Sequence, residues 1–206
     1  ACAPYRRLNL CNKNFQNINS KDSSKAKNDL LLEVCMAAKY EGDSIKTRYP
    51  KHERTNPDTK SQLCTVLARS FADIGDIVRG RDIFRGNDKE KEQRKQLDKK
   101  LKEIFQQIHS KVTKNGAKDR YKDTTNYYEL REDWWTANRS TVWKAITCDA
   151  GQNDKYFRNT CNGGEQTKGY CRCNNDQPGE DKANVDPPTY FDYVPQYLRW
   201  FEEWAE

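Results

Sequence analysis

The chain has 206 residues, enough for one large domain or two small lobes, and its net charge of +6 weakly favours polyanionic partners such as nucleic acid, sulfated glycan or an anionic membrane face. Hydrophobic residues make up only 34% and charged residues 33%, which predicts a narrow core with long polar loops. No apolar run approaches the roughly 18 residues of a membrane span, and no apolar segment of a signal peptide is present.

Five segments place apolar residues at the 3.6-residue spacing of an amphipathic helix. The first spans residues 27–39 and turns Cys35 toward the interior. The second runs from about residue 59 to 78, with Asp58 as its N-cap. The third, residues 88–112, has the clearest buried stripe, and its charged first turns are spaced for i,i+4 ion pairs that include Glu90 with Arg94 and Asp98 with Lys102.

The remaining two predicted helices are rich in aromatic residues. Residues 125–147 contain Trp134, Trp135 and Trp143, more ring surface than one helix face can bury, so we expect this helix to pack against two neighbours. Residues 194–205 place Tyr197, Trp200, Phe201 and Trp204 on one side, with Pro195 acceptable in the first turn.

Three stretches, residues 1–26, 41–56 and 148–188, show neither a helical nor a strand period. A loop as long as the last one is uncommon unless it is tied down or functional, and its four cysteines are the expected ties. The sequence therefore predicts an all-α, disulfide-linked helical bundle with long irregular loops. We expect an irregular N-terminal lobe at residues 1–57 and the helical bundle at 58–206, with the disulfide-rich loop at 148–188.

Eight cysteines, an even number, indicate a disulfide framework formed in an oxidising compartment. Zinc is the alternative, but Cys171 and Cys173 are separated by one residue, not the usual two, and His52 and His109 are distant in sequence. We therefore expect no metal and no other cofactor. The spacing leaves the pairing open for the predicted disulfide residues Cys2, Cys11, Cys35, Cys64, Cys148, Cys161, Cys171 and Cys173.

A near match to a phosphate-binding loop raises the question of an enzyme. Gly75, Gly80 and Arg81 almost fit G-x-x-x-x-G-K-[ST], but that motif needs a lysine and a hydroxyl after a strand. Here Arg81 and Asp82 follow a segment of helical period, so we interpret Gly75 as a close-packing point in a core-facing helix and residues 79–82 as its charged exit. With no nucleophile elbow, no H-E-x-x-H motif and only two histidines, the sequence predicts no enzyme.

Two basic segments, both expected to be loops, are candidates for binding sulfate or phosphate groups. One leaves the third helix through Asn115 and Gly116, and the other lies in the second irregular stretch. Either segment could instead serve only to keep a loop soluble. The candidate ligand-binding residues are Lys111, Lys114, Lys118, Arg120 and Lys122 in the first segment, and Lys46, Arg48, Lys51 and Arg54 in the second.

Two further functions are set aside on sequence grounds. Nucleic-acid binding would show a strongly basic recognition helix or displayed stacking aromatics, whereas the aromatics here lie on helix faces expected to be buried, so we expect no nucleic-acid partner. The glycosylation sequon at Asn138 lies inside the tryptophan-rich helix, and we interpret it as a coincidence.

Four stretches together resemble the Duffy-binding-like domain, alpha class, of erythrocyte membrane protein one, a variant surface antigen family of the malaria parasite Plasmodium falciparum. These are "CAPYRRLNLC" near the start, residues 68–84, "LREDWWTANRSTVWKAITC" at 130–148 and the closing "DYVPQYLRWFEEWAE". The resemblance spans essentially the whole chain. It implies subdomains one and two of a three-subdomain fold, and the cysteines from Cys148 to Cys173 resemble the four-cysteine subset of the class.

The resemblance implies a cell-adhesion module, important for virulence and subject to antigenic variation, displayed on the outer face of the infected erythrocyte as part of a larger membrane protein. Expected partners are a host erythrocyte or endothelial receptor, a sulfated glycan of the heparan sulfate type or a blood-group sugar (rosetting), host antibodies, and neighbouring domains of the same long chain. The alternative is a structural, antigenically variable scaffold whose receptor is bound by neighbouring domains.

Overall fold

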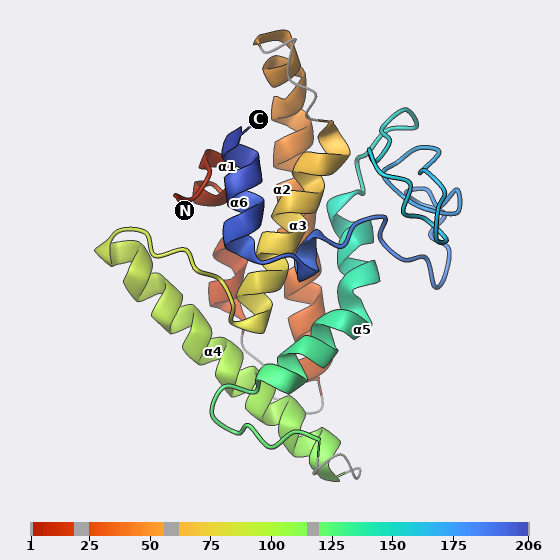
Figure 1. Cartoon of the computed structure of the whole chain (residues 1–206). Coiled ribbons are helices and arrows are strands. Elements are labelled where there is room, and N and C mark those ends of the chain that lie inside the picture. Colours follow the sequence, from red (N-terminus) through yellow and green to blue (C-terminus); the bar gives the residue numbers. More distant parts are fainter. Residues whose placement is uncertain (1, 19–24, 56–61, 115–119, 206) are drawn as a thin grey trace.

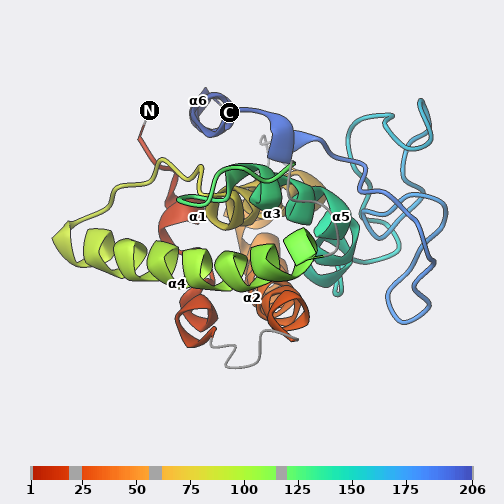
Figure 2. The same ribbon diagram turned by 90° about the horizontal axis from the view of Figure 1, so that it is seen from below.

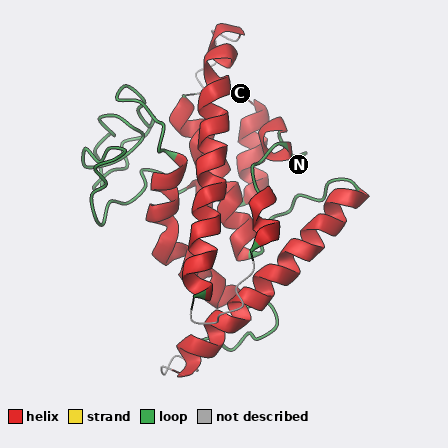
Figure 3. Ribbon diagram, turned by 180° about the vertical axis from the view of Figure 1, so that it is seen from behind, coloured by secondary structure: helices red, strands yellow, loops and turns green. Residues whose placement is uncertain are grey.

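The computed structural model describes residues 2–18, 25–55, 62–114 and 120–205. Within these ranges the structure consists of helices and loops and contains no β-strand (Figure 3), which confirms the predicted all-α class. No helix in the described part is long and apolar enough to cross a membrane. In chain order the elements are α1 (Tyr5–Leu8), η1 (Lys13–Asn17), α2 (Ala26–Thr55), α3 (Leu63–Arg79), α4 (Asp88–Val112), α5 (Tyr128–Ile146), η3 (Phe191–Tyr193) and α6 (Gln196–Ala205).

Helix α2 is much longer than the sequence predicts and continues through residues 41–55, which we expected to be irregular. Gly42 lies where α2 crosses α5, because a Cβ atom at this position would be 2.1 Å from the Ile146 carbonyl oxygen. The glycine therefore permits close helix packing. The described residues 26–55 are thus helical and pack against α3 and α5 (Figure 1), whereas the division of the chain into two units at residue 57 stays a prediction.

Helix α3 is the centre of the core, and its predicted seam is confirmed. The seam residues Leu63, Leu67, Phe71, Ile74 and Val78 are all buried. The helix ends at Gly80, whose φ of 74° lies in the left-handed region, and the Arg81 N–H then donates to the Asp76 carbonyl at 2.8 Å. The expected N-cap, Asp58, lies outside the described residues.

Helices α4 and α5 bury their predicted faces against the rest of the bundle, with α4 lying across its lower side (Figure 2). Asp98 and Lys102 form the predicted ion pair at 2.9 Å. Glu90 does not pair with Arg94; its carboxylate accepts the Asn87 N–H in a capping box that starts the helix. Helix α5 packs against three helices, one more than expected: α2, α3, where Trp135 lies against Phe71, and α4, where Trp134 lies against Phe105.

The two ends of the described chain lie close together (Figure 1). Trp204 of α6 donates its indole N–H to the Cys2 carbonyl at 2.9 Å. Of the aromatic residues predicted to share one side of this helix, only Trp200 is buried, whereas Tyr197, Phe201 and Trp204 are exposed.

A buried ion network fastens α1 and α6 to α3. Asp73 of α3 is fully buried, with Arg6 of α1 and Arg199 of α6 each 2.7 Å from its carboxylate. Burial alone would raise the pKa of Asp73, but the two guanidinium groups hold it below its ordinary value. A second buried carboxylate, Asp192 of η3, accepts hydrogen bonds from Arg139 and Trp135 of α5 at 2.8 Å.

The long segment at 148–188 is irregular, as predicted, apart from two isolated β-bridges. Two disulfides hold it: Cys64–Cys171 ties it to the first turn of α3, and Cys161–Cys173 closes a short loop within it. The expectation that all eight cysteines form disulfides is wrong for Cys2, Cys11, Cys35 and Cys148, which are unpaired.

Three of the four unpaired cysteines are held as thiols by their surroundings. Burial raises the pKa of Cys11, Cys35 and Cys148 to about 11, and for Cys148 the carboxylates of Asp149 and Asp43 add to the effect. The Cys148 sulfur lies 3.7 Å from an Asp43 carboxylate oxygen. These sulfurs contact carboxylates or core side chains in place of a second sulfur.

Candidate functional site

The first predicted basic segment lies at the C-terminal end of α4. Lys111 is in the last turn of that helix, and Lys114 and Lys122 are exposed beyond it, while Lys118 lies outside the described residues. The Arg120 guanidinium holds the Asp133 carboxylate of α5 through two hydrogen bonds of 2.6 and 2.8 Å. A charge neutralised in this way attracts a ligand less than a free one.

The second predicted segment is not a loop. Lys46, Arg48, Lys51 and Arg54 all lie on α2, and nothing is described of the Arg54 side chain. Lys46 is engaged with Asp154 of the disulfide loop at 2.8 Å. Arg48 and Lys51 are exposed.

The two basic segments do not come together. Figure 1 shows the C-terminal end of α2 at the top of the molecule and the C-terminal end of α4 at the bottom. A single small ligand therefore cannot contact both, and each would have to act as a separate basic surface.

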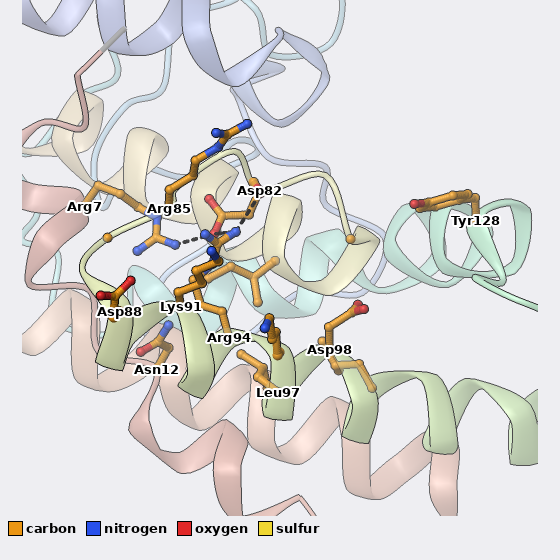
Figure 4. A pocket seen from close by; sticks show the side chains of 15 residues that line it. Arg7, Asn12, Asp82, Arg85, Asp88, Lys91, Arg94, Leu97, Asp98 and Tyr128 are labelled. Carbon is orange, nitrogen blue, oxygen red and sulfur yellow. Dashed lines mark hydrogen bonds and ion pairs between the residues drawn. The ribbon is translucent and has the colours of Figure 1, made fainter.

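A cleft of about 610 Å³ lies between them, on the flank of the bundle. One wall is the first half of α4, and the other is formed by α1 and the loop from Gly80 to Gly86 (Figure 4). Five basic side chains line it against three acidic ones, a net charge of +2. The charged residues are Arg7, Arg85, Lys91, Arg94 and Lys95, with Asp82, Asp88 and Asp98.

Asp82 is the hub of the cleft. Its carboxylate is 2.5 Å from Arg7 and 3.5 Å from Arg94, and it accepts a hydrogen bond of 2.8 Å from Gln196 of α6. The guanidinium carbons of the two arginines lie 4.6 and 5.6 Å from the centre of the Phe84 ring, so that the loop is clamped between α1 and α4.

Two basic side chains at the mouth of the cleft have fewer interactions than Arg7 and Arg94. The side chains of Arg85 and Lys91 are exposed and make no ion pair or hydrogen bond with any described residue. Sequence reasoning missed this cleft because its basic residues alternate with acidic ones along the chain. The signal that could have found it is "RGRDIFRGND", in which two glycines flank two arginines between two helices.

The cleft explains why the loop resembled a phosphate-binding motif without being one. Gly80 and Gly86 have φ values of 74° and 61° and bend the chain around the cleft. Gly80 ends a helix, however, whereas the motif needs a glycine loop that begins one after a strand. Gly75 is packed inside α3, as predicted.

One group of three side chains in the described part of the chain could in principle ligate a metal: Asp43, Cys148 and Asp149, whose ligand atoms lie within 4.8 Å of one another. A hydrogen bond that the protonated Asp43 carboxyl donates to Asp149 raises the pKa of Asp43, and burial raises the pKa of Cys148 as well. Partly exposed acidic groups often lie this close together without a bound ion, so we assign the group no metal.

Comparison with known proteins gives one consistent result. The family model described as "Duffy binding domain" matches residues 1–199. The chain is 41% identical to the NTS-DBL1(alpha-1) domain of membrane protein 1 (PfEMP1) of Plasmodium falciparum, varO strain, with a TM-score of 0.75. The match covers 100% of this chain and 43% of that structure. It is 33% identical to an ICAM-1-binding PfEMP1 DBLβ domain, with a TM-score of 0.67, and this match covers 98% of the present chain and 41% of that structure.

A curated relative is more distant. The Duffy receptor beta form of Plasmodium knowlesi is 22% identical over 211 residues, which is 99% of this chain and 14% of that protein. The chain thus spans less than half the length of each of these relatives.

Proposed function

Because the chain belongs to the Duffy binding domain family, with alpha-class PfEMP1 domains among its structural relatives, we propose that it is an adhesion module that binds a host-cell receptor or glycan. The observation that carries the proposal is the match of the family model to residues 1–199. A structural relative is described as binding ICAM-1, and the curated relative as a Duffy receptor. We place the module on the outer face of the infected erythrocyte, as part of a longer membrane protein.

The basic surface at the end of α4 is our candidate contact for a heparan sulfate-type polyanion, and hence for rosetting. It carries Lys111 in the last turn of α4, Lys114 just after it and the exposed Lys122 in the loop before α5. Contact between exposed charges is screened over about 8 Å at physiological ionic strength, so binding should weaken as salt is added. The exposed Arg48 and Lys51 on α2 offer a smaller second surface.

Heparin-affinity chromatography tests this assignment. We expect a variant with Lys111, Lys114, Lys118 and Lys122 changed to Glu to elute at clearly lower salt than the native chain. Arg120 is left unchanged so that its ion pair with Asp133 is preserved. The matched control changes four exposed lysines elsewhere to Glu: Lys25, Lys27, Lys155 and Lys168. Equal elution of the two variants would mean that only net charge matters, and the assignment of the α4 end would be rejected.

Erythrocyte binding by the isolated chain tests the function itself. An adhesion module should attach to uninfected erythrocytes, or to cells displaying one host receptor, in a saturable and salt-sensitive way. If the chain binds none of these while a longer piece that includes neighbouring domains does, the chain is instead a scaffold that presents variable loops.

A further inference from the structure

We propose that Arg172 determines which cysteines pair in the irregular segment at 148–188, because it holds its two neighbours, Cys171 and Cys173, toward different partners. Four cysteines allow three pairings, and the structure holds the one that joins Cys64 to Cys171 and Cys161 to Cys173. The inference goes beyond the adhesive function and does not depend on it.

The sequence around the two cysteines does not by itself favour one pairing. In an extended chain, residues i and i+2 point to the same side, so Cys171 and Cys173 would present their sulfur atoms to the same partner. Either of them could then reach Cys64. Something in the fold must turn the two side chains apart.

The backbone before Arg172 makes the first part of this turn. Tyr170 and Cys171 have φ values of 55° and 54°, in the left-handed region that residues with a side chain rarely adopt. Two hydrogen bonds hold this conformation: the Cys171 carbonyl accepts the Trp143 indole N–H at 3.0 Å, and the Cys171 N–H donates to the Asp154 carbonyl at 2.8 Å. The chain therefore does not run straight from one cysteine to the next.

The two cysteines end in separate apolar clusters. Cys171 and Cys64 belong to the main core, whereas Cys173 and Cys161 form a small cluster of their own with Val185. All four are nearly inaccessible to solvent. An exchange of partners would thus move two sulfur atoms out of the apolar surroundings that now bury them.

The Arg172 side chain fixes the second part of the turn. Only 2% of its surface is exposed. At the end of α5 its guanidinium donates to the Thr147 hydroxyl and to the Lys144 carbonyl, each at 2.8 Å. On its other side it pairs with Asp176 at 3.1 Å and with Asp181 at 2.6 Å. Turning this segment to exchange the cysteines would pull a buried charge away from these partners, which is costly.

Exchange of the partners needs a small thiol but no net oxidation, since both disulfides are conserved. The thiolate of the small molecule attacks the sulfur of Cys64 and releases the Cys171 thiolate. That thiolate attacks Cys161 and releases the Cys173 thiolate. The Cys173 thiolate then displaces the small thiolate from Cys64, which completes the second pairing. Arg172 disfavours this product because its contacts fit only the first pairing.

Disulfide mapping after incubation in a buffer of reduced and oxidised glutathione tests the proposal. Free thiols are alkylated, the chain is digested without reductant, and electron-transfer dissociation in a mass spectrometer cleaves the backbone between Cys171 and Cys173. We expect Arg172→Gln to raise the fraction of the other two pairings among these four cysteines by about tenfold or more, since hydrogen bonds to charged groups are worth that factor each.

Arg158→Gln is the matched control, because Arg158 is an exposed arginine of the same segment. Its fraction of other pairings should stay within about twofold of the native chain, as is usual for surface substitutions. Equal fractions in the two variants would overturn the proposal. So would a rise confined to pairings with Cys2, Cys11, Cys35 or Cys148, because that result indicates general loss of folding.

A second variant covers the case in which circular dichroism shows that Arg172→Gln has lost its helices. Arg172→Lys keeps the charge, but a single ammonium group cannot span the hydroxyl, the carbonyl and the two carboxylates that the guanidinium reaches. We expect it to raise the other pairings above the level of Arg158→Lys. A folded Arg172→Lys chain with the native pairing alone would show that the guanidinium contacts do not select the disulfides.

Discussion

At Gly75 the backbone of α3 passes directly beneath the indole ring of Trp135. A Cβ atom there would lie 2.7 Å from a ring carbon, closer than real Cβ contacts, and the ring cannot turn away freely because its N–H is bonded to the buried Asp192. The interface between α3 and α5 therefore depends on a residue that contributes no side chain.

Replacing Gly75 with Leu should lower the free energy of unfolding by about 1–3 kcal/mol, the usual cost of overpacking a core. Urea denaturation monitored by circular dichroism measures it. Gly164→Leu is the matched control, since nothing lies within 4 Å of a Cβ at that position in the disulfide loop. If both variants were equally stable, the close contact with Trp135 would have no energetic weight.

The sequence alone does not show which basic side chains are already paired with acidic ones. Sequence correctly placed Lys111 and Lys122 in a basic segment, but it could not show that Arg120 is held by Asp133 or that Lys46 is held by Asp154. These partners lie 13 and 108 residues away, and only the fold brings them together. The free cations of the cleft, Arg85 and Lys91, were overlooked because neighbouring acids hide them in a count of charge.

At the scale of elements, hydrophobic period predicted α3 and α4 well because each has one strongly apolar face. It failed for the second half of α2, where residues 41–55 show no helical period although Gly42 allows the helix to pack closely against α5. It also placed the start of α5 three residues early, at Thr125. The helix starts at Tyr128 because Asp123 folds the preceding turn, with its carboxylate accepting N–H groups of Thr125, Asn126 and Tyr128 at 2.9–3.2 Å.

Asp123→Ala should therefore destabilise the protein by about 1 kcal/mol, the typical cost of losing a capping side chain. The backbone donors hold the pKa of Asp123 below its ordinary value. A lowered folded-state pKa adds stability above the unfolded value of about 3.9 and loses it as pH falls through the folded value. The difference in unfolding free energy between native chain and variant should thus shrink in acid.

Asp123→Asn is the control for this prediction, because an amide oxygen can still accept the backbone hydrogen bonds but does not titrate. It should be less destabilised than Asp123→Ala. A difference between the native chain and Asp123→Ala that stays constant from neutral pH down to pH about 3 would contradict the role of the carboxylate charge.

At the scale of the whole molecule, two disulfides hold the irregular segment at 148–188, and they close loops of different length. Cys64 and Cys171 are 107 residues apart in sequence, and Cys161 and Cys173 are 12 apart. In the chain-entropy model a longer closed loop constrains the unfolded chain more.

Replacing Cys64 and Cys171 with Ala should therefore cost about 2 kcal/mol more than replacing Cys161 and Cys173. Unfolding in urea without reductant measures both, and each double variant serves as the control for the other. A larger loss for the short loop would show that native contacts, and not chain entropy, determine the difference.

The longer disulfide also decides what survives a cut on the surface. A protease that cleaves after the exposed Lys155 severs the peptide chain, yet Cys64–Cys171 still joins the two pieces, and α6 stays attached to α3. A cut after Lys182 falls beyond the last cysteine, so residues 183–206 would be held only by packing and by ion pairs such as Arg199 with Asp73. The same loop thus contains sites where a cut leaves the two pieces covalently joined and one where only non-covalent contacts retain α6.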